Sequence, residues 1–187
     1  MLKPIIGYLK WWVWSKNLHG VHSPFLFKFV RECVYGKDEL SKFQNIEQIR
    51  DELLKNQNVL TFTDYGAGSA KDKRRASGAD SIINRRISQI AKNSLQQKKY
   101  CRLLHRIVNY FQVNTVLELG TSLGITTSYL AIGDNSPTIY TVEGAKTIAE
   151  NAQQVFERQN LKNICLNTNT FDEYFQSIEK DRSEERR

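Results

Sequence analysis

The second half of the chain alternates between short apolar runs and longer helical repeats. From about residue 113, β-branched or leucine-rich runs alternate with segments in which apolar residues recur every three or four positions. The expected strands are 114–119, 138–143 and 163–168, and the expected helices are 124–133, 145–160 and 171–180. Because helices of this length separate the strands, the pattern predicts parallel pairing through right-handed crossovers. The expected fold class is α/β, with a partial parallel sheet of three strands.

The first half shows helical periodicity with one short extended piece. The expected helices are 5–13, 25–33, 43–56, 81–94 and 98–112, and the expected strand is 59–64. Residues 66–80 are small, polar and basic, which is typical of a loop. We therefore expect two parts: a mainly helical region with a basic, glycine-containing loop (1–97), and a partial sheet domain (98–187).

The turn after the first parallel strand reads "LELGTSLGITT" and carries glycines at 120 and 124. A dinucleotide-binding turn has the pattern G-x-G-x-x-G, but here Ser122 and Ile125 occupy the second and third glycine positions. The lysine that ends a P-loop is also missing. Neither a pyrophosphate nor a triphosphate is favoured, so the turn suits a less charged nucleoside.

Glu143, at the end of the next strand, lies 23 positions after Gly120. An acidic residue about 20 positions after such a turn can accept hydrogen bonds from ribose hydroxyls. The carboxyl ends of adjacent parallel strands open on the same crevice, so this spacing predicts a ribose site.

With these residues in place, the sequence resembles class I S-adenosylmethionine-dependent methyltransferases, which have a Rossmann-like sheet. The turn is similar to the first motif of the small-molecule O-methyltransferases. The resemblance implies that five residues line the methionine end of S-adenosylmethionine: Glu118, Gly120, Thr121, Ser122 and Gly124. It also implies that Thr126 binds the cofactor carboxylate, and that Glu143, with Gly144 beside it, holds the ribose hydroxyls. The implied acceptor is a small molecule.

The resemblance covers most of the chain but leaves parts of the family pattern unmatched. Asn169 and Thr170 fall where the family contacts adenine, without the usual acidic residue. The segments "HGVHSPFLF", "DYGAGS" and "RRISQIAKNS" look like an extension of some bacterial members. The family core has seven strands and only three are expected here. We therefore expect a C-terminally shortened form or a sheet completed by a partner, with no assignable catalytic residue and no metal ligand. The alternative to a methyltransferase is a catalytically incomplete module that binds S-adenosylmethionine.

A second glycine cluster, "TDYGAGSA" at 63–70, also follows an expected strand. A basic loop follows it instead of an apolar helix, and no later strand brings back an acidic residue. We interpret this segment as a loop that covers the site or meets the acceptor. His22 is the residue to test as a general base, because the unperturbed pKa of histidine lies near neutrality.

The chain has 27 basic and 20 acidic residues, a formal net charge of +7, which suits an anionic partner. The basic positions cluster at Lys71, Lys73, Arg74 and Arg75, with Arg85 and Arg86 beyond. Aromatic residues do not interleave with this cluster, so a solvated surface is favoured over nucleic-acid binding.

For the segment "WWVW" at 11–14, packing within a helical subdomain or a homo-oligomer interface is favoured over contact with a membrane surface. No apolar run reaches the length of a transmembrane helix. Three widely spaced cysteines are typical of reduced thiols, so a cytoplasmic location is expected.

Overall fold

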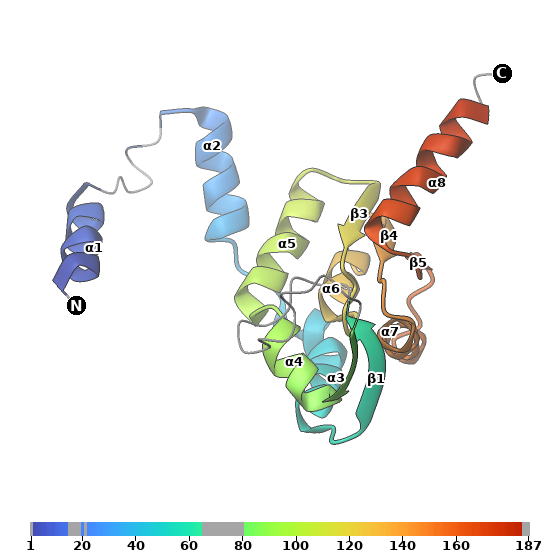
Figure 1. Ribbon diagram of the computed structural model, residues 1–187. Coiled ribbons are helices and arrows are strands. Elements are labelled where there is room, and N and C mark those ends of the chain that lie inside the picture. Colours follow the sequence, from blue (N-terminus) through green and yellow to red (C-terminus); the bar gives the residue numbers. More distant parts are fainter. Residues whose placement is uncertain (1, 15–19, 21, 65–80, 185–187) are drawn as a thin grey trace. The chain divides into compact units, whose positions relative to one another are not determined.

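The computed structural model describes residues 2–14, 20, 22–64 and 81–184 (Figure 1). The chain divides into two compact units, Met1–Asp38 and Glu39–Arg187. The first unit contains α1 (Leu2–Trp14), α2 (Pro24–Phe29) and the π-helix η2 (Val30–Val34). Ser23 begins α2, because its hydroxyl accepts the Leu26 backbone N–H at 3.3 Å. Within the described part of the chain, every helix is too short or too polar to span a bilayer.

The second unit carries both sheets. Its elements, in chain order, are the 3₁₀-helix η3 (Leu40–Phe43), α3 (Gln44–Lys55), β1 (Val59–Asp64), β2 (Ser81–Arg86), α4 (Ile87–Ser94), α5 (Lys98–Tyr110), β3 (Thr115–Leu119), α6 (Ile125–Ala131), β4 (Thr138–Val142), α7 (Lys146–Arg158), β5 (Ile164–Asn167) and α8 (Phe171–Glu184).

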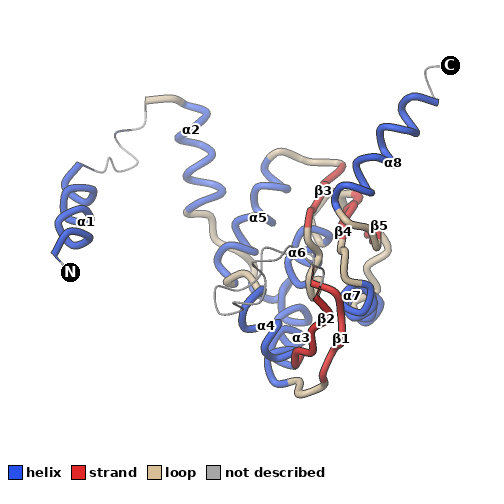
Figure 2. Tube along the Cα trace, in the orientation of Figure 1, coloured by secondary structure: helices blue, strands red, loops and turns tan. Residues whose placement is uncertain are grey.

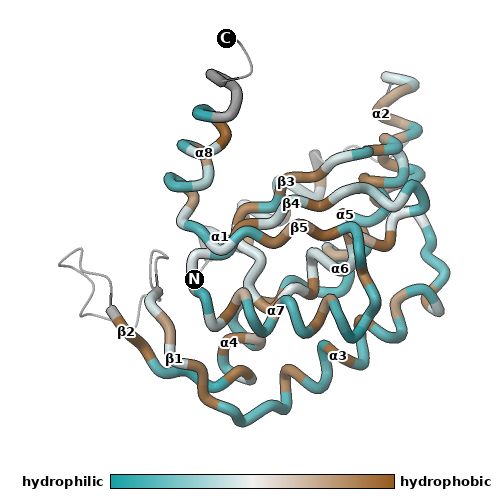
Figure 3. The backbone as a smooth tube through the Cα atoms, turned by 90° about the vertical axis from the view of Figure 1, so that its right-hand side faces the viewer, coloured by the Kyte–Doolittle hydropathy of each residue, from teal (hydrophilic) through white to brown (hydrophobic). Residues whose placement is uncertain are grey.

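The strands β3, β4 and β5 form a parallel sheet in that order. This arrangement confirms the predicted α/β class, its Rossmann-like parallel sheet and the helical region before it. Helices α6 and α7 lie against one face (Figure 3), where Ile139 is fully buried. On the other face Leu117, Leu119 and Tyr140 are each at least 40% exposed. The period-two alternation along β3 therefore separates a packed face from an open one.

The expected helix over 81–94 is wrong in its first half. Residues 81–86 form β2, which pairs antiparallel with β1, and only α4 is helical (Figure 2). Ile83 stands opposite Phe62 in this ladder, and Phe62 packs into the core. The two β-branched isoleucines of β2 suit a strand, and the pairing partner lies about 20 positions away, beyond the reach of local periodicity.

The predicted boundary at residue 97 does not separate compact units. Phe43 and Ile49, from the helical region, share one buried cluster with Ile125, Tyr129 and other residues of the sheet part. The helical segments from residue 39 onward therefore belong to the same core as the sheet.

A buried polar cluster reinforces this junction. The carboxylate of Glu47, on α3, accepts a hydrogen bond from Tyr129 of α6 and lies 2.5 Å from Lys98 Nζ of α5. Burial alone would raise the pKa of Glu47, but the hydrogen bonds from Lys98 and Tyr129 outweigh it and lower the pKa. Arg50 is 4% exposed and donates to the Gln96 carbonyl at 2.8 Å. These contacts fix α3 against α5 and α6.

Replacing Gly124 should destabilise this unit. Its φ is +75°, and a Cβ there would lie 2.6 Å from the Phe156 ring. We expect Gly124→Ala to cost about 2–4 kcal/mol, from left-handed backbone strain plus overpacking. Urea unfolding monitored by circular dichroism measures the loss. Gly7→Ala is the control, because no atom lies within 4 Å of its added Cβ. Equal unfolding midpoints for the two variants would contradict the packing role of Gly124.

Candidate functional site

The turn between β3 and α6 is held in a left-handed path. Gly120, Ser122 and Gly124 have φ values of +93°, +49° and +75°. The backbone N–H groups of Gly120 and Thr121 donate to the Val142 carbonyl at 2.9 and 3.2 Å. The turn therefore continues the contact between β3 and β4 beyond the last pair of the sheet. Glycine suits the positive φ at 120 and 124 because it has no side chain, whereas Ser122 adopts a positive φ although it carries one.

Glu143 joins the end of β4 to this turn. Its Oε2 accepts the Ser122 N–H at 2.9 Å, and its Oε1 accepts the Ala145 N–H at 3.0 Å. The backbone N–H of Glu143 donates to the Asn167 carbonyl at 2.9 Å, which ties the same position to β5. A carboxylate can accept about four hydrogen bonds, so this half-buried group keeps capacity for a ligand.

Glu118 has a different environment, directed into the protein. Its Oε2 accepts the hydroxyls of Thr127 and Thr141 at 2.6 and 2.7 Å. The Thr141 hydroxyl also lies 2.6 Å from that of Thr121. Burial raises the pKa of Glu118, the two hydroxyl donors partly offset this, and the negative charge of Glu143 raises the pKa further. Glu118 thus supports the turn from within.

The structure brings the predicted site residues together around this turn, but in two layers. Thr121 and Gly124 are buried and shape the turn from inside. The residues that keep exposed surface are Gly120, Ser122, Glu143 and Gly144. Thr126 is half-buried, with its hydroxyl 4.0 Å from the Cys101 Sγ.

Ser94 is a neighbour of the turn that the sequence did not indicate. It ends α4, and its hydroxyl accepts that of Ser122 at 2.8 Å across 28 positions of sequence. Its own hydroxyl donates to the Ile90 carbonyl at 2.8 Å, which orients it. A single serine between two helices carries no pattern, so only the tertiary contact reveals it.

Phe171, the first residue of α8, is also close to the turn. Its ring Cζ lies 4.0 Å from the position of a Cβ built on Gly120. Thr170, just before it, accepts the Glu173 N–H at 3.3 Å and donates to the Glu173 carboxylate at 2.8 Å, so it caps α8. Asn169 is exposed beside it.

Several other candidates belong to the other compact unit, fall outside the described residues or have a structural role. His22 is exposed and belongs to the Met1–Asp38 unit. The glycine cluster at 65–70 and the basic positions at 71–75 fall outside the described residues. His105 is buried, with Nδ1 3.1 Å from the Tyr129 carbonyl, which indicates a structural role.

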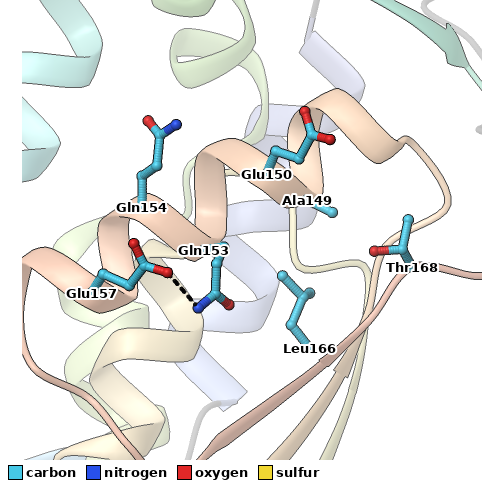
Figure 4. Close-up of a pocket in the computed structure, with 7 residues that line it drawn as sticks. All are labelled: Ala149, Glu150, Gln153, Gln154, Glu157, Leu166 and Thr168. Atoms are coloured by element: carbon cyan, nitrogen blue, oxygen red, sulfur yellow. Dashed lines mark hydrogen bonds between the residues drawn. The ribbon is translucent and has the colours of Figure 1, made fainter.

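No group of three or more His, Cys, Asp or Glu side chains within the described ranges is arranged to hold a metal ion. A shallow surface groove of about 520 Å³ lies along α7 and β5 (Figure 4). Its lining includes Glu150, Gln153 and Glu157, and the Gln153 amide donates to Glu157 at 3.0 Å. The groove contains none of the predicted site residues, so it is a separate feature.

No protein-family model and no curated protein matches the chain. Similar solved structures include an O-methyltransferase from Bacillus cereus in complex with SAH, the O-methyltransferase TomG from Streptomyces achromogenes in complex with SAM, and a methyltransferase from Geobacter sulfurreducens. Their identities to this chain are 19%, 20% and 20%, with TM-scores of 0.47, 0.42 and 0.41. The matches cover 82%, 44% and 44% of this chain.

The same matches cover 53%, 38% and 46% of those solved chains, so this chain spans about half of their length or less. All three proteins are named as methyltransferases, the class that the sequence motif resembles.

The raised pKa of Glu118 predicts a pH-dependent stability difference. A carboxyl whose pKa is higher in the folded state than in the unfolded state destabilises the fold as it ionises. Above its ordinary value of 4.5, wild type should therefore lose stability relative to Glu118→Gln as the pH rises. Urea unfolding between about pH 4 and 7 measures this, with the exposed Glu150→Gln as the charge control. A difference between wild type and Glu118→Gln that stays flat over this range would rule the effect out.

Proposed function

We propose that this chain binds S-adenosylmethionine and acts in methyl transfer to a small-molecule acceptor. The observation that carries this proposal is the Glu143 carboxylate at the end of β4, hydrogen-bonded to the amide of Ser122 in the positive-φ turn. This arrangement presents a ribose-binding acceptor beside a turn with small side chains, at the carboxyl ends of two parallel strands.

The residues at the turn fit a nucleoside without phosphates. Glu143 lies close enough to Glu118 for its negative charge to raise the pKa of Glu118. Such a pair repels a phosphate and attracts the positive sulfonium of S-adenosylmethionine. Gly120 is exposed, and a Cβ added there would be in van der Waals contact with the Phe171 ring at 4.0 Å, so the end of β3 lies beside an aromatic side chain.

The chain's own groups would bind and orient the reactants. Glu143 would hold the ribose hydroxyls through the acceptor capacity that its two backbone contacts leave. Glu118, with the hydroxyls of Thr127 and Thr141, would keep the turn in its bound shape. When bound, the cofactor supplies a methyl group already activated on sulfur, so the principal contribution of the protein is positioning.

Cofactor binding can be measured directly by isothermal titration calorimetry. We expect heat on titrating S-adenosylmethionine or S-adenosylhomocysteine into the wild-type chain. Glu143→Ala should weaken the affinity about tenfold or more, because it removes hydrogen bonds to a charged acceptor. Glu150→Ala, a carboxylate exposed on α7, is the matched control and should bind as wild type does.

Because Glu143 also holds the turn, Glu143→Gln is a second variant that keeps one oxygen acceptor. It should retain more affinity than Glu143→Ala, with both variants folded by circular dichroism. Methyl transfer is then tested with a methyl-tritiated cofactor and small-molecule fractions as acceptors. Absence of cofactor heat in a folded wild-type chain would overturn the proposal, and cofactor binding with no transfer to any fraction would overturn its catalytic part.

A further inference from the structure

Helix α1 presents large apolar side chains to solvent. The exposed fractions are 56% for Ile5, 48% for Ile6, 62% for Tyr8, 52% for Leu9, 62% for Trp11, 65% for Trp12 and 70% for Val13. A soluble surface rarely exposes so many large apolar residues in one short element, and such a patch marks a binding surface. The helix belongs to the Met1–Asp38 unit.

All the charged side chains of residues 1–31 are basic. Residues 1–31 contain no Asp or Glu and five basic residues: Lys3, Lys10, Lys16, Lys28 and Arg31. Their sum of +5 makes up most of the chain's net charge of +7. Arg31 pairs with Glu32 at 3.0 Å, whereas Lys10 is exposed on α1 itself.

We propose that α1 is an interfacial helix that binds the surface of an anionic lipid bilayer. Basic residues together with tryptophan, tyrosine and aliphatic residues, without an acidic residue, are typical of helices that lie in the headgroup region. Tyr8 and Trp11 add amphipathic rings, with centroids 5.6 Å apart, of the kind enriched at that boundary. At 13 residues α1 is about 20 Å long, too short to cross a hydrocarbon core of about 30 Å.

The charges and the aliphatic residues favour an anionic bilayer over a second copy of the chain and over single-stranded nucleic acid. A second copy would bring one cationic helix against another, and like charges oppose that pairing. Single-stranded nucleic acid is also anionic, but it uses aromatic rings for stacking. The exposed Ile5, Leu9 and Val13 cannot stack on bases, and they gain most from burial among acyl chains.

The tryptophans make the test specific, because all three in the chain are in α1, at positions 11, 12 and 14. Their emission therefore reports on this helix alone. We expect a blue shift and co-sedimentation of the full chain with vesicles of phosphatidylcholine and phosphatidylglycerol. Binding should be weaker with phosphatidylcholine alone and should weaken as salt is raised.

Two variants separate the apolar and charged contributions while keeping every tryptophan. The double substitution Ile5→Ser and Leu9→Ser should abolish the shift, whereas Ile82→Ser, at a residue 75% exposed in the sheet unit, is the matched control and should leave it unchanged. Lys10→Glu should weaken binding to anionic vesicles by about fivefold or more. Circular dichroism checks that each variant folds, and the vesicle readouts involve no cofactor, so this test is independent of the methyl-transfer proposal.

Absence of both blue shift and co-sedimentation with anionic vesicles would overturn the inference. Equal binding to neutral and anionic vesicles would overturn the role of the lysines. A protein-concentration-dependent oligomer lost in the double serine variant, without vesicle binding, would assign α1 to a second copy. A blue shift with single-stranded oligonucleotides but not with vesicles would assign it to nucleic acid.

Discussion

The hydrogen bond from the Ser122 amide to the Glu143 carboxylate is the contact on which the candidate site depends. Beyond the last paired residues of β3 and β4, the turn follows a left-handed path in which the Gly120 and Thr121 amides both donate to the Val142 carbonyl. The Glu143 carboxylate accepts the Ser122 backbone N–H there, at 2.9 Å, and is itself held beside the turn by this hydrogen bond. The same hydrogen bond therefore positions the Glu143 carboxylate and stabilises the turn.

A second carboxylate, that of Glu118, supports the turn from inside the protein. Glu118 is held by the threonine hydroxyls of α6 and β4, and Thr141 extends the chain of hydrogen bonds to Thr121. Buried polar groups are stable when their partners are supplied, and this network supplies them with short hydroxyl side chains. The two acids thus have separate tasks: one supports the turn, and the other keeps acceptor capacity beside it.

The helical segments from residue 39 onward take part in the site and are not an appendage. Glu47 links α3 to α5 and α6, the helices that precede and follow β3 in the chain. The hydroxyl of Ser94 accepts a hydrogen bond from that of Ser122. A change in this helical region would therefore be transmitted to the turn through packing and hydrogen bonds. The exposed apolar side chains of α1 belong to the other compact unit, Met1–Asp38.

The order of strands and helices after residue 113 could be predicted from the sequence, because each element depends on its own periodicity and turn residues. The spacing of Gly120 and Glu143 likewise predicted which strand ends meet, since parallel pairing follows from the helices between them. The strand at 81–86 could not be predicted in this way, because it forms only by pairing with β1.

Tertiary structure alone decided the rest of the site. It placed Ser94 beside Ser122, turned Thr121 inward, and set the Phe156 ring where Gly124 admits no side chain. The sequence determined which groups were available, because backbone preferences and local repeats act over a few residues. The packing of distant segments decided which groups stay accessible to a ligand, because burial and hydrogen bonding depend on neighbours that lie far away along the chain.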